Sequence, residues 1–179
     1  MKVLRAVTKC AQAAALLVML FATASAGGMS GPEPTDVGKL AAGKQAYRAQ
    51  DYTKAMRLLE PLADAGDPVA QYYVAHMYEK GDGVAKDTAK TLGWYRRSAE
   101  QGYARAQYKL AIGYARGWPG LEKDEAEARR WLLKAANGGS SSAQRVLAKA
   151  YEQGELGFER DPEQARYWLE RASSKKATQ

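Results

Sequence analysis

The side chains best suited to catalysis are sparse in this sequence. It contains one histidine, His76, and one cysteine, Cys10. A zinc site needs several such ligands at short spacing, and His76 stands alone. The glycine pairs follow helical patterns and no Gly-Lys-Ser/Thr comes after them, so they are not phosphate-binding loops. This inventory predicts no catalytic residues, no metal and no cofactor, and therefore a chain that is not an enzyme.

A second set of side chains is better suited to binding. Two tyrosines and an isoleucine offer apolar contact area, while a histidine and two basic residues share the same pattern. The set is Tyr72, His76, Tyr108, Ile112, Arg145 and Lys149. These residues predict a stripe that binds a protein or a peptide, with an apolar anchor and acidic residues in the partner.

Other roles remain open for several of these residues. Tyr72 and Tyr108 would equally suit packing between successive helices, because tyrosine serves both purposes. His76 is either a half-exposed polar residue or a group with a pH-sensing or ligand role. Trp118 precedes a proline in a loop, where it covers the end of a hairpin or marks a contact with a partner.

Most of these side chains lie within three copies of one sequence unit. The copies begin at Gln71, Gln107 and Gln144, so the glutamine returns after 36 and then 37 residues. A tyrosine, a glycine, an aspartate and a tryptophan follow in every copy. These anchors are Tyr78, Gly81, Asp87 and Trp94, then Tyr114, Gly117, Asp124 and Trp131, then Tyr151, Gly154, Asp161 and Trp168. A period of this length indicates a solenoid of stacked helical pairs.

Each anchor has a physical role in a unit made of helix, loop and helix. The glycine ends the first helix in the left-handed conformation, and the aspartate caps the second by accepting bonds from its free N–H groups. The tryptophan begins a buried stripe of large and then small residues on the second helix. On the first helix, valine or leucine and the anchor tyrosine occupy the core side. Its third, seventh and tenth positions are therefore expected to face a concave groove.

The stretch from Ala70 to Gly102 resembles the Sel-one-like repeat (SLR) family, a relative of the tetratricopeptide repeats, nearly throughout. The other two copies match at most anchors, with one extra residue in the glycine loop. The resemblance implies an all-α, right-handed α-solenoid of about four helix-loop-helix hairpins used for protein–protein contact. Some family members have been linked to β-lactam binding or hydrolysis. Those resemble disulfide-rich forms whose cysteines this chain lacks, so that activity is not carried over.

The repeats define the domain organisation. Residues 37–66 resemble a degenerate first hairpin, and terminal repeats are expected to be atypical. The solenoid is predicted to span residues 37–174, with units at about 37–66, 67–102, 103–139 and 140–174. Residues 27–36 contain glycine, proline and serine and are expected to form a flexible leader. Residues 175–179 form a basic tail.

The first 26 residues are typical of an export signal. A basic start is followed by an apolar run at residues 11–22 and by the small-residue cleavage site Ala24-Ser25-Ala26. A helix that spans a bilayer needs about 20 apolar residues, so this run is too short to be one. A signal that is retained as a membrane anchor is the alternative. Cleavage would remove Cys10 and three basic residues, lowering the formal charge from +7 to +4. The alanine-rich signal favours the bacterial periplasm.

These observations together predict an exported, non-catalytic interaction module. We expect a periplasmic regulator or adaptor that binds a protein or peptide in its groove, and no nucleic acid, because a mild positive charge on an exported protein does not favour one. An envelope-remodelling or β-lactam-interacting enzyme is one alternative, which turnover would reveal. A structural subunit of a secretion or polysaccharide-export assembly is another, which an obligate complex would reveal. The identity of the partner and the oligomeric state are left open.

Overall fold

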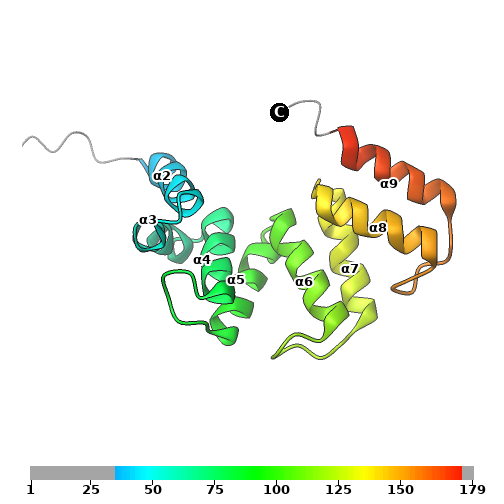
Figure 1. Ribbon diagram of the computed structural model, residues 1–179, viewed down its shortest axis with the longest axis horizontal. Helices are drawn as coiled ribbons and strands as arrows, with labels where there is room; N and C mark the ends of the chain where they lie inside the picture. The colour runs from blue at the N-terminus through cyan, green and yellow to red at the C-terminus, as the bar shows by residue number, and fades with distance from the viewer. Residues whose placement is uncertain (1–34, 175–179) are drawn as a thin grey trace, which may run out of the picture. The chain divides into compact units, whose positions relative to one another are not determined.

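The computed structural model describes residues 35–174 of the chain, and in this part it contains eight helices and no strand. They are α2 (Asp36–Arg48), α3 (Tyr52–Asp64), α4 (Pro68–Lys80), α5 (Thr88–Glu100), α6 (Ala104–Arg116), α7 (Glu125–Asn137), α8 (Ser141–Gln153) and α9 (Pro162–Ser174). Four hairpins follow one another in chain order (Figure 1). The predicted all-α solenoid of four hairpins is confirmed. The predicted signal peptide (1–26), nearly all of the leader (27–36) and the tail (175–179) lie outside the described residues.

Polar caps define where the helices begin and end. Asp87 accepts a hydrogen bond from the Lys90 amide at the start of α5, and Asp124 accepts two at the start of α7. Gly81, Gly117 and Gly154 adopt the left-handed conformation at the ends of α4, α6 and α8. A further bond joins the two ends, because the amide of each capping aspartate in the last three hairpins donates to the carbonyl of that hairpin's anchor tyrosine. The loop is therefore closed at its base.

The core consists of the inward faces of successive hairpins. Trp131 and Trp168 are buried, whereas Trp94 is half-buried, with the guanidinium carbon of Arg97 4.8 Å from the centre of its ring. Alanine is the commonest residue in the buried cluster that extends over the last three hairpins. These alanines are Ala75, Ala99, Ala106, Ala111, Ala135, Ala136, Ala143 and Ala148. Their small side chains allow the helices of neighbouring hairpins to pack closely in the core.

The repeated glutamine joins each hairpin to the one before it. The Nε2 atoms of Gln71, Gln107 and Gln144 donate to backbone carbonyls of the preceding hairpin at 3.1, 3.1 and 3.0 Å. The acceptors are Ala63, Ala99 and Ala136, which lie in the last turns of α3, α5 and α7. Carbonyls in a last helical turn have no partner within their own helix. These three carbonyls also accept a bond from the amide of a following glycine, so the glutamine adds a second bond to each and joins the two hairpins.

The second glycine of each loop packs against the preceding hairpin. Gly83 has a φ of +72°, and a Cβ added there would lie 2.7 Å from the Cβ of Tyr52. A Cβ at Gly120 would lie 3.0 Å from a methyl of Leu92, and the Gly157 carbonyl accepts a hydrogen bond from Arg129 at 2.8 Å. The loops therefore contribute to stacking as well as to turning the chain.

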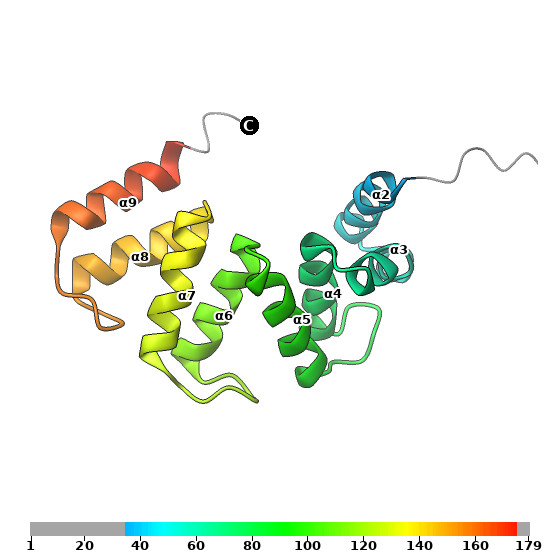
Figure 2. The same ribbon diagram turned by 180° about the vertical axis from the view of Figure 1, so that it is seen from behind.

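The first hairpin keeps the same plan with different residues. Gln50, at φ +61°, takes the place of a left-handed glycine, and Asp51 caps α3 through the Lys54 amide. Helix α3 continues through Pro61 to Asp64. Across residues 35–174, no helix is long and apolar enough to cross a lipid bilayer. The view from behind shows the same order of hairpins (Figure 2).

Candidate peptide-binding site

A cavity of about 620 Å³ lies where the second, third and fourth hairpins meet. Helix α4 contributes Tyr72 to its lining. The start of α6 contributes Tyr103, Arg105, Tyr108 and Lys109. The connector into α8 contributes Gly138, Gly139 and Ser140, and the first turn of α8 contributes Ser141 and Ser142. We call this space the tyrosine cavity. Its lining combines aromatic faces with basic and hydroxyl groups, so it can hold an apolar side chain beside an anionic one.

The repeat brings these residues together. Tyr72 and Tyr108 occupy the same position in successive units, one turn into α4 and α6, so stacking brings both to the lining of the cavity. Arg105 and Lys109 are four residues apart and share a face of α6. Helix α8 begins at the cavity, where Ser140 caps it by accepting a bond from the Ala143 amide at 3.3 Å. Free N–H groups at a helix start favour negative charge.

Tyr72 both lines the cavity and packs within an aromatic cluster. Its ring centre lies 5.3 Å from that of Tyr103, 5.5 Å from Tyr73 and 5.8 Å from Tyr95. Burial raises the pKa of Tyr72 to about 12, although the nearby charge of Arg105 acts in the opposite direction. Its hydroxyl therefore stays protonated at neutral pH and remains a hydrogen-bond donor. The cluster holds the aromatic wall in place, so the binding and packing roles are compatible.

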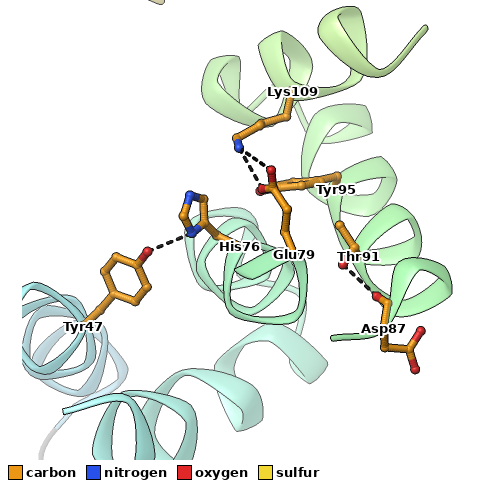
Figure 3. Close-up of polar contacts among 7 residues, drawn as sticks. All are labelled: Tyr47, His76, Glu79, Asp87, Thr91, Tyr95 and Lys109. Atoms are coloured by element: carbon orange, nitrogen blue, oxygen red, sulfur yellow. Dashed lines mark hydrogen bonds and ion pairs between the residues drawn. The ribbon is translucent and has the colours of Figure 1, made fainter. Parts of the chain in front are cut away.

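An ion pair borders the tyrosine cavity. The Nζ atom of Lys109 lies 2.7 and 3.0 Å from the two carboxylate oxygens of Glu79, and the hydroxyl of Tyr95 donates to the same carboxylate at 2.5 Å (Figure 3). Burial alone would raise the pKa of Glu79, but the hydrogen bonds from Lys109 and Tyr95 hold it below its ordinary value. The three residues come from α6, α4 and α5, so the pair links the second hairpin to the third.

His76 lies beside this region but does not line the cavity. Its Nδ1 atom is 2.8 Å from the hydroxyl of Tyr47 on α2, which joins the first hairpin to the second (Figure 3). Its ring centre is 6.1 Å from that of Tyr72. Burial, followed by the charge of Lys109, lowers the pKa of His76 below its ordinary value, against the opposing charges of Glu79 and Asp82. The structure therefore gives His76 a contact between two hairpins.

We expect His76 to make folding stability depend on pH. Its folded pKa is below its unfolded pKa, so the folded chain binds that proton less readily. The corresponding stability is complete above the unfolded value of about 6.5 and is lost as pH falls toward the folded value. Denaturant melts from about pH 7.5 to 5 should show a steeper loss for the wild type than for His76→Gln. Carboxylates titrate in both proteins, so their contribution to the pH dependence is shared. Identical pH profiles for the two proteins would therefore contradict this role of His76.

Trp118 lies at a second cavity, of about 240 Å³, at the loop edge. The lining includes Leu92 on α5 and Pro119 in the following loop. Trp118 is half-buried and packs against the core, and a Cβ added at Gly113 would lie 3.1 Å from its ring. Its indole therefore covers the end of its hairpin and also forms one wall of an opening, which we call the tryptophan cavity.

The structure unites some of the predicted binding residues and separates others. Tyr72 and Tyr108 share the tyrosine cavity, while Ile112 is half-buried on the same helix as Tyr108. Arg145 and Lys149 are exposed on α8 and are not part of the lining.

Sequence reasoning missed several residues that do line the tyrosine cavity. They are Tyr103, Arg105, Lys109, Ser141 and Ser142. The signal available in the sequence was the spacing of Arg105 and Lys109 on one helical face. The two serines begin α8, and only the stacking of the hairpins brings them to the cavity. Among residues 35–174, no group of three or more histidine, cysteine, aspartate or glutamate side chains is placed to hold a metal ion.

The chain is similar to solved repeat proteins. It resembles a Sel1 repeat protein from Oxalobacter formigenes, with a TM-score of 0.71 and 31% identity over 77% of this chain and 56% of that one. A protective antigen of uropathogenic Escherichia coli strains, displaying an SLR fold, gives a TM-score of 0.67 and 31% identity. That match covers 79% of this chain and 31% of the antigen.

A curated relative and a family model extend the comparison. Chitin synthase regulatory factor 3 of Schizosaccharomyces pombe is 34% identical over 68 residues, which is 38% of this chain and 7% of that protein. The chain thus spans only a small part of this relative. The Sel1 repeat model matches residues 40–67, 68–103, 104–140 and 141–176. The Sel1 repeat fold is a protein-interaction scaffold and is generally non-enzymatic. With four matched repeats over most of its length, the chain belongs to the Sel1 repeat family.

Proposed function

We propose that this chain is a non-catalytic adaptor or regulator that binds an acidic peptide segment of a partner protein in the tyrosine cavity. The observation that carries this proposal is the composition of the cavity: the rings of Tyr72 and Tyr108 beside the charge of Arg105 and the start of α8. Aromatic and arginine side chains are enriched among residues that dominate binding energy. A partner carboxylate would meet positive potential here, and a neighbouring apolar side chain would meet tyrosine.

The charge near the cavity supports an acidic occupant. Lys109 is neutralised by Glu79, whereas Arg105 is exposed at the cavity. Arg145 and Lys149 add positive charge on α8 at a greater distance from the lining. Arg105 is therefore placed to contact a bound carboxylate, and the α8 pair is placed to attract an acidic partner before contact.

Tyr108→Ala is expected to weaken partner binding by about 2 kcal/mol, the threshold for an interface hot spot. The half-buried ring lines the cavity, so its loss removes contact area while the core residues of α6 remain. The test is affinity purification of the tagged protein from envelope extract, followed by titration of the recovered partner. Tyr167→Ala is the matched control, because Tyr167 is exposed on α9 away from the cavity. Unchanged affinity for Tyr108→Ala would remove the cavity as the site.

The same titration separates contact from steering. Arg105→Glu should speed dissociation, because it places a like charge beside the bound carboxylate. Charge reversal at both Arg145 and Lys149 should mainly slow association and reduce its dependence on salt. If the α8 double variant alone affected dissociation, the contact site would lie on α8 instead.

We also propose that the protein acts in the periplasm after export. This rests on the basic start, the apolar run and Ala24-Ser25-Ala26 in the sequence. The protein purified from its native compartment is expected to begin at Gly27, because signal peptidase cleaves after a small-x-small motif. Intact-mass measurement checks this directly. A chain that retains Met1 and partitions with membranes would be an anchored protein instead.

A regulatory role has separate support. The relative from Schizosaccharomyces pombe is named as a regulatory factor, and this chain resembles a 68-residue part of it. A scaffold that binds a peptide without turnover can regulate by controlling where its partner assembles. Recovery of the partner in the envelope experiment would identify which process is regulated.

A further inference from the structure

We infer that the bound peptide uses a second subsite, the tryptophan cavity, which takes one apolar side chain about three to five residues away from the acidic group. This inference rests on the proposed function and specifies its ligand. In this arrangement Trp118 forms part of a binding wall. The acidic group of the peptide lies in the tyrosine cavity, and its apolar side chain lies at the loop edge.

The tryptophan cavity has the size and lining of a side-chain pocket. Its volume is about 240 Å³, whereas small-molecule sites typically measure about 300–1,000 Å³. The ring of Trp118 and the side chains of Leu92 and Pro119 form apolar walls, and Tyr78 contributes a further aromatic surface. Leu92 is 5% exposed, so this wall is anchored in the core. An aliphatic or phenyl side chain would replace water against these walls.

The two cavities adjoin one ion pair. Lys109 lines the tyrosine cavity, and its partner Glu79 lines the tryptophan cavity. The Nζ atom of Lys109 is also 5.9 Å from the centre of the Trp118 ring. Figure 3 shows this pair above Thr91, which also lines the tryptophan cavity. Because Glu79 neutralises Lys109, the surface between the subsites does not require a charged residue in the peptide.

Helix geometry gives the spacing between the subsites. Tyr72 and Glu79 are seven residues apart on α4, which corresponds to about 10 Å at about 1.5 Å per residue. Tyr108 is eight residues before Arg116, where α6 ends, which corresponds to about 12 Å on the same measure, and Trp118 follows in the loop. An extended peptide advances about 3.3 Å per residue, so about three to five residues cover this range. An acidic residue and an apolar residue at that separation would reach both cavities.

The test uses fluorescein-labelled 12-residue glycine-serine peptides that carry one Glu-Glu pair and one phenylalanine. The phenylalanine is moved from one to eight residues away from the nearest glutamate, and affinity for the purified full chain is read by fluorescence polarisation. We expect affinity to peak at a separation of about three to five residues, about tenfold above the peptide without phenylalanine. Acidic peptides that bind equally at every separation would overturn the second subsite and leave the tyrosine cavity intact. No binding by any acidic peptide would overturn the proposed function as well.

Variants at the rim decide whether the gain comes from the tryptophan cavity. Thr88 is exposed, lines that cavity and begins α5; Glu125 occupies the equivalent position in α7, so Thr88→Glu is compatible with the fold. Thr88→Glu should abolish the gain from phenylalanine while the peptide without phenylalanine still binds. Thr53→Glu, in the first turn of α3, is the control for added charge. Trp118→Ala should have the same effect as Thr88→Glu, provided that its melt shows a folded chain. Persistence of the gain in Thr88→Glu would contradict the assignment.

Discussion

Trp131→Ala is expected to lower the free energy of unfolding by about 3–5 kcal/mol, the range for removing a large aromatic side chain from a core. Trp131 is 7% exposed and belongs to the same cluster as Leu110 and Leu147. The charged atoms of Arg130 and Lys134 each lie 4.8 Å from its ring centre, so truncation also removes two cation–π contacts. Denaturant melts of the variant and the wild type measure the loss.

Trp118→Ala is the control for that experiment. From sequence alone, Trp118 is a loop residue away from the core, and its loss would be under about 1 kcal/mol. The structure shows it half-buried against Gly113, which raises the expected loss to about 1–2 kcal/mol. Equal losses for Trp118→Ala and Trp131→Ala would mean that the buried face of α7 has been misassigned.

Gly83→Ala is expected to destabilise the fold by about 2–4 kcal/mol, because two effects add. The φ of +72° is unfavourable for any residue with a Cβ. The added Cβ would also lie 2.7 Å from the Cβ of Tyr52 and 3.2 Å from its backbone carbonyl carbon. Backbone cannot move aside as a flexible side chain can, so loop and helix would separate. Denaturant melts again give the loss of stability.

Gly102→Ala isolates the conformational part of that cost. Gly102 has a φ of +90°, and nothing lies within 4 Å of an added Cβ. Its expected loss is therefore about 1–2 kcal/mol, the conformational cost alone. The difference between the two losses of stability measures how much the packing of the Gly83 loop against the first hairpin contributes to the free energy of unfolding. If both glycines gave the same loss, that packing would contribute nothing to stability.

The hairpins were predictable because their determinants are local. Asp87 and Gly81 act within a few residues of their own positions, so a repeated spacing reveals caps and loops directly. The buried stripe of α7 was equally readable from its 3.6-residue period. These features depend on one helix or one loop at a time.

The site was less predictable because it is built from three hairpins. The position of Arg105 relative to the start of α8 depends on how the third and fourth hairpins stack, which no local pattern encodes. The contact of Glu79 with Lys109 spans 30 residues. In the sequence, Gln71 serves only as a marker of the repeat. Its role as a link between hairpins is visible only in the structure.

The glutamine links also make the solenoid unequal along its length. At the first link, the Oε1 atom of Gln71 accepts a bond from Gln101 at 2.9 Å. The Oε1 atoms of Gln107 and Gln144 are buried and have no hydrogen-bond partner within residues 35–174. Leaving such an atom unsatisfied costs about 1–3 kcal/mol. Under a pulling force the later links would therefore yield before the first, and separation of the fourth hairpin would dismantle the tyrosine cavity.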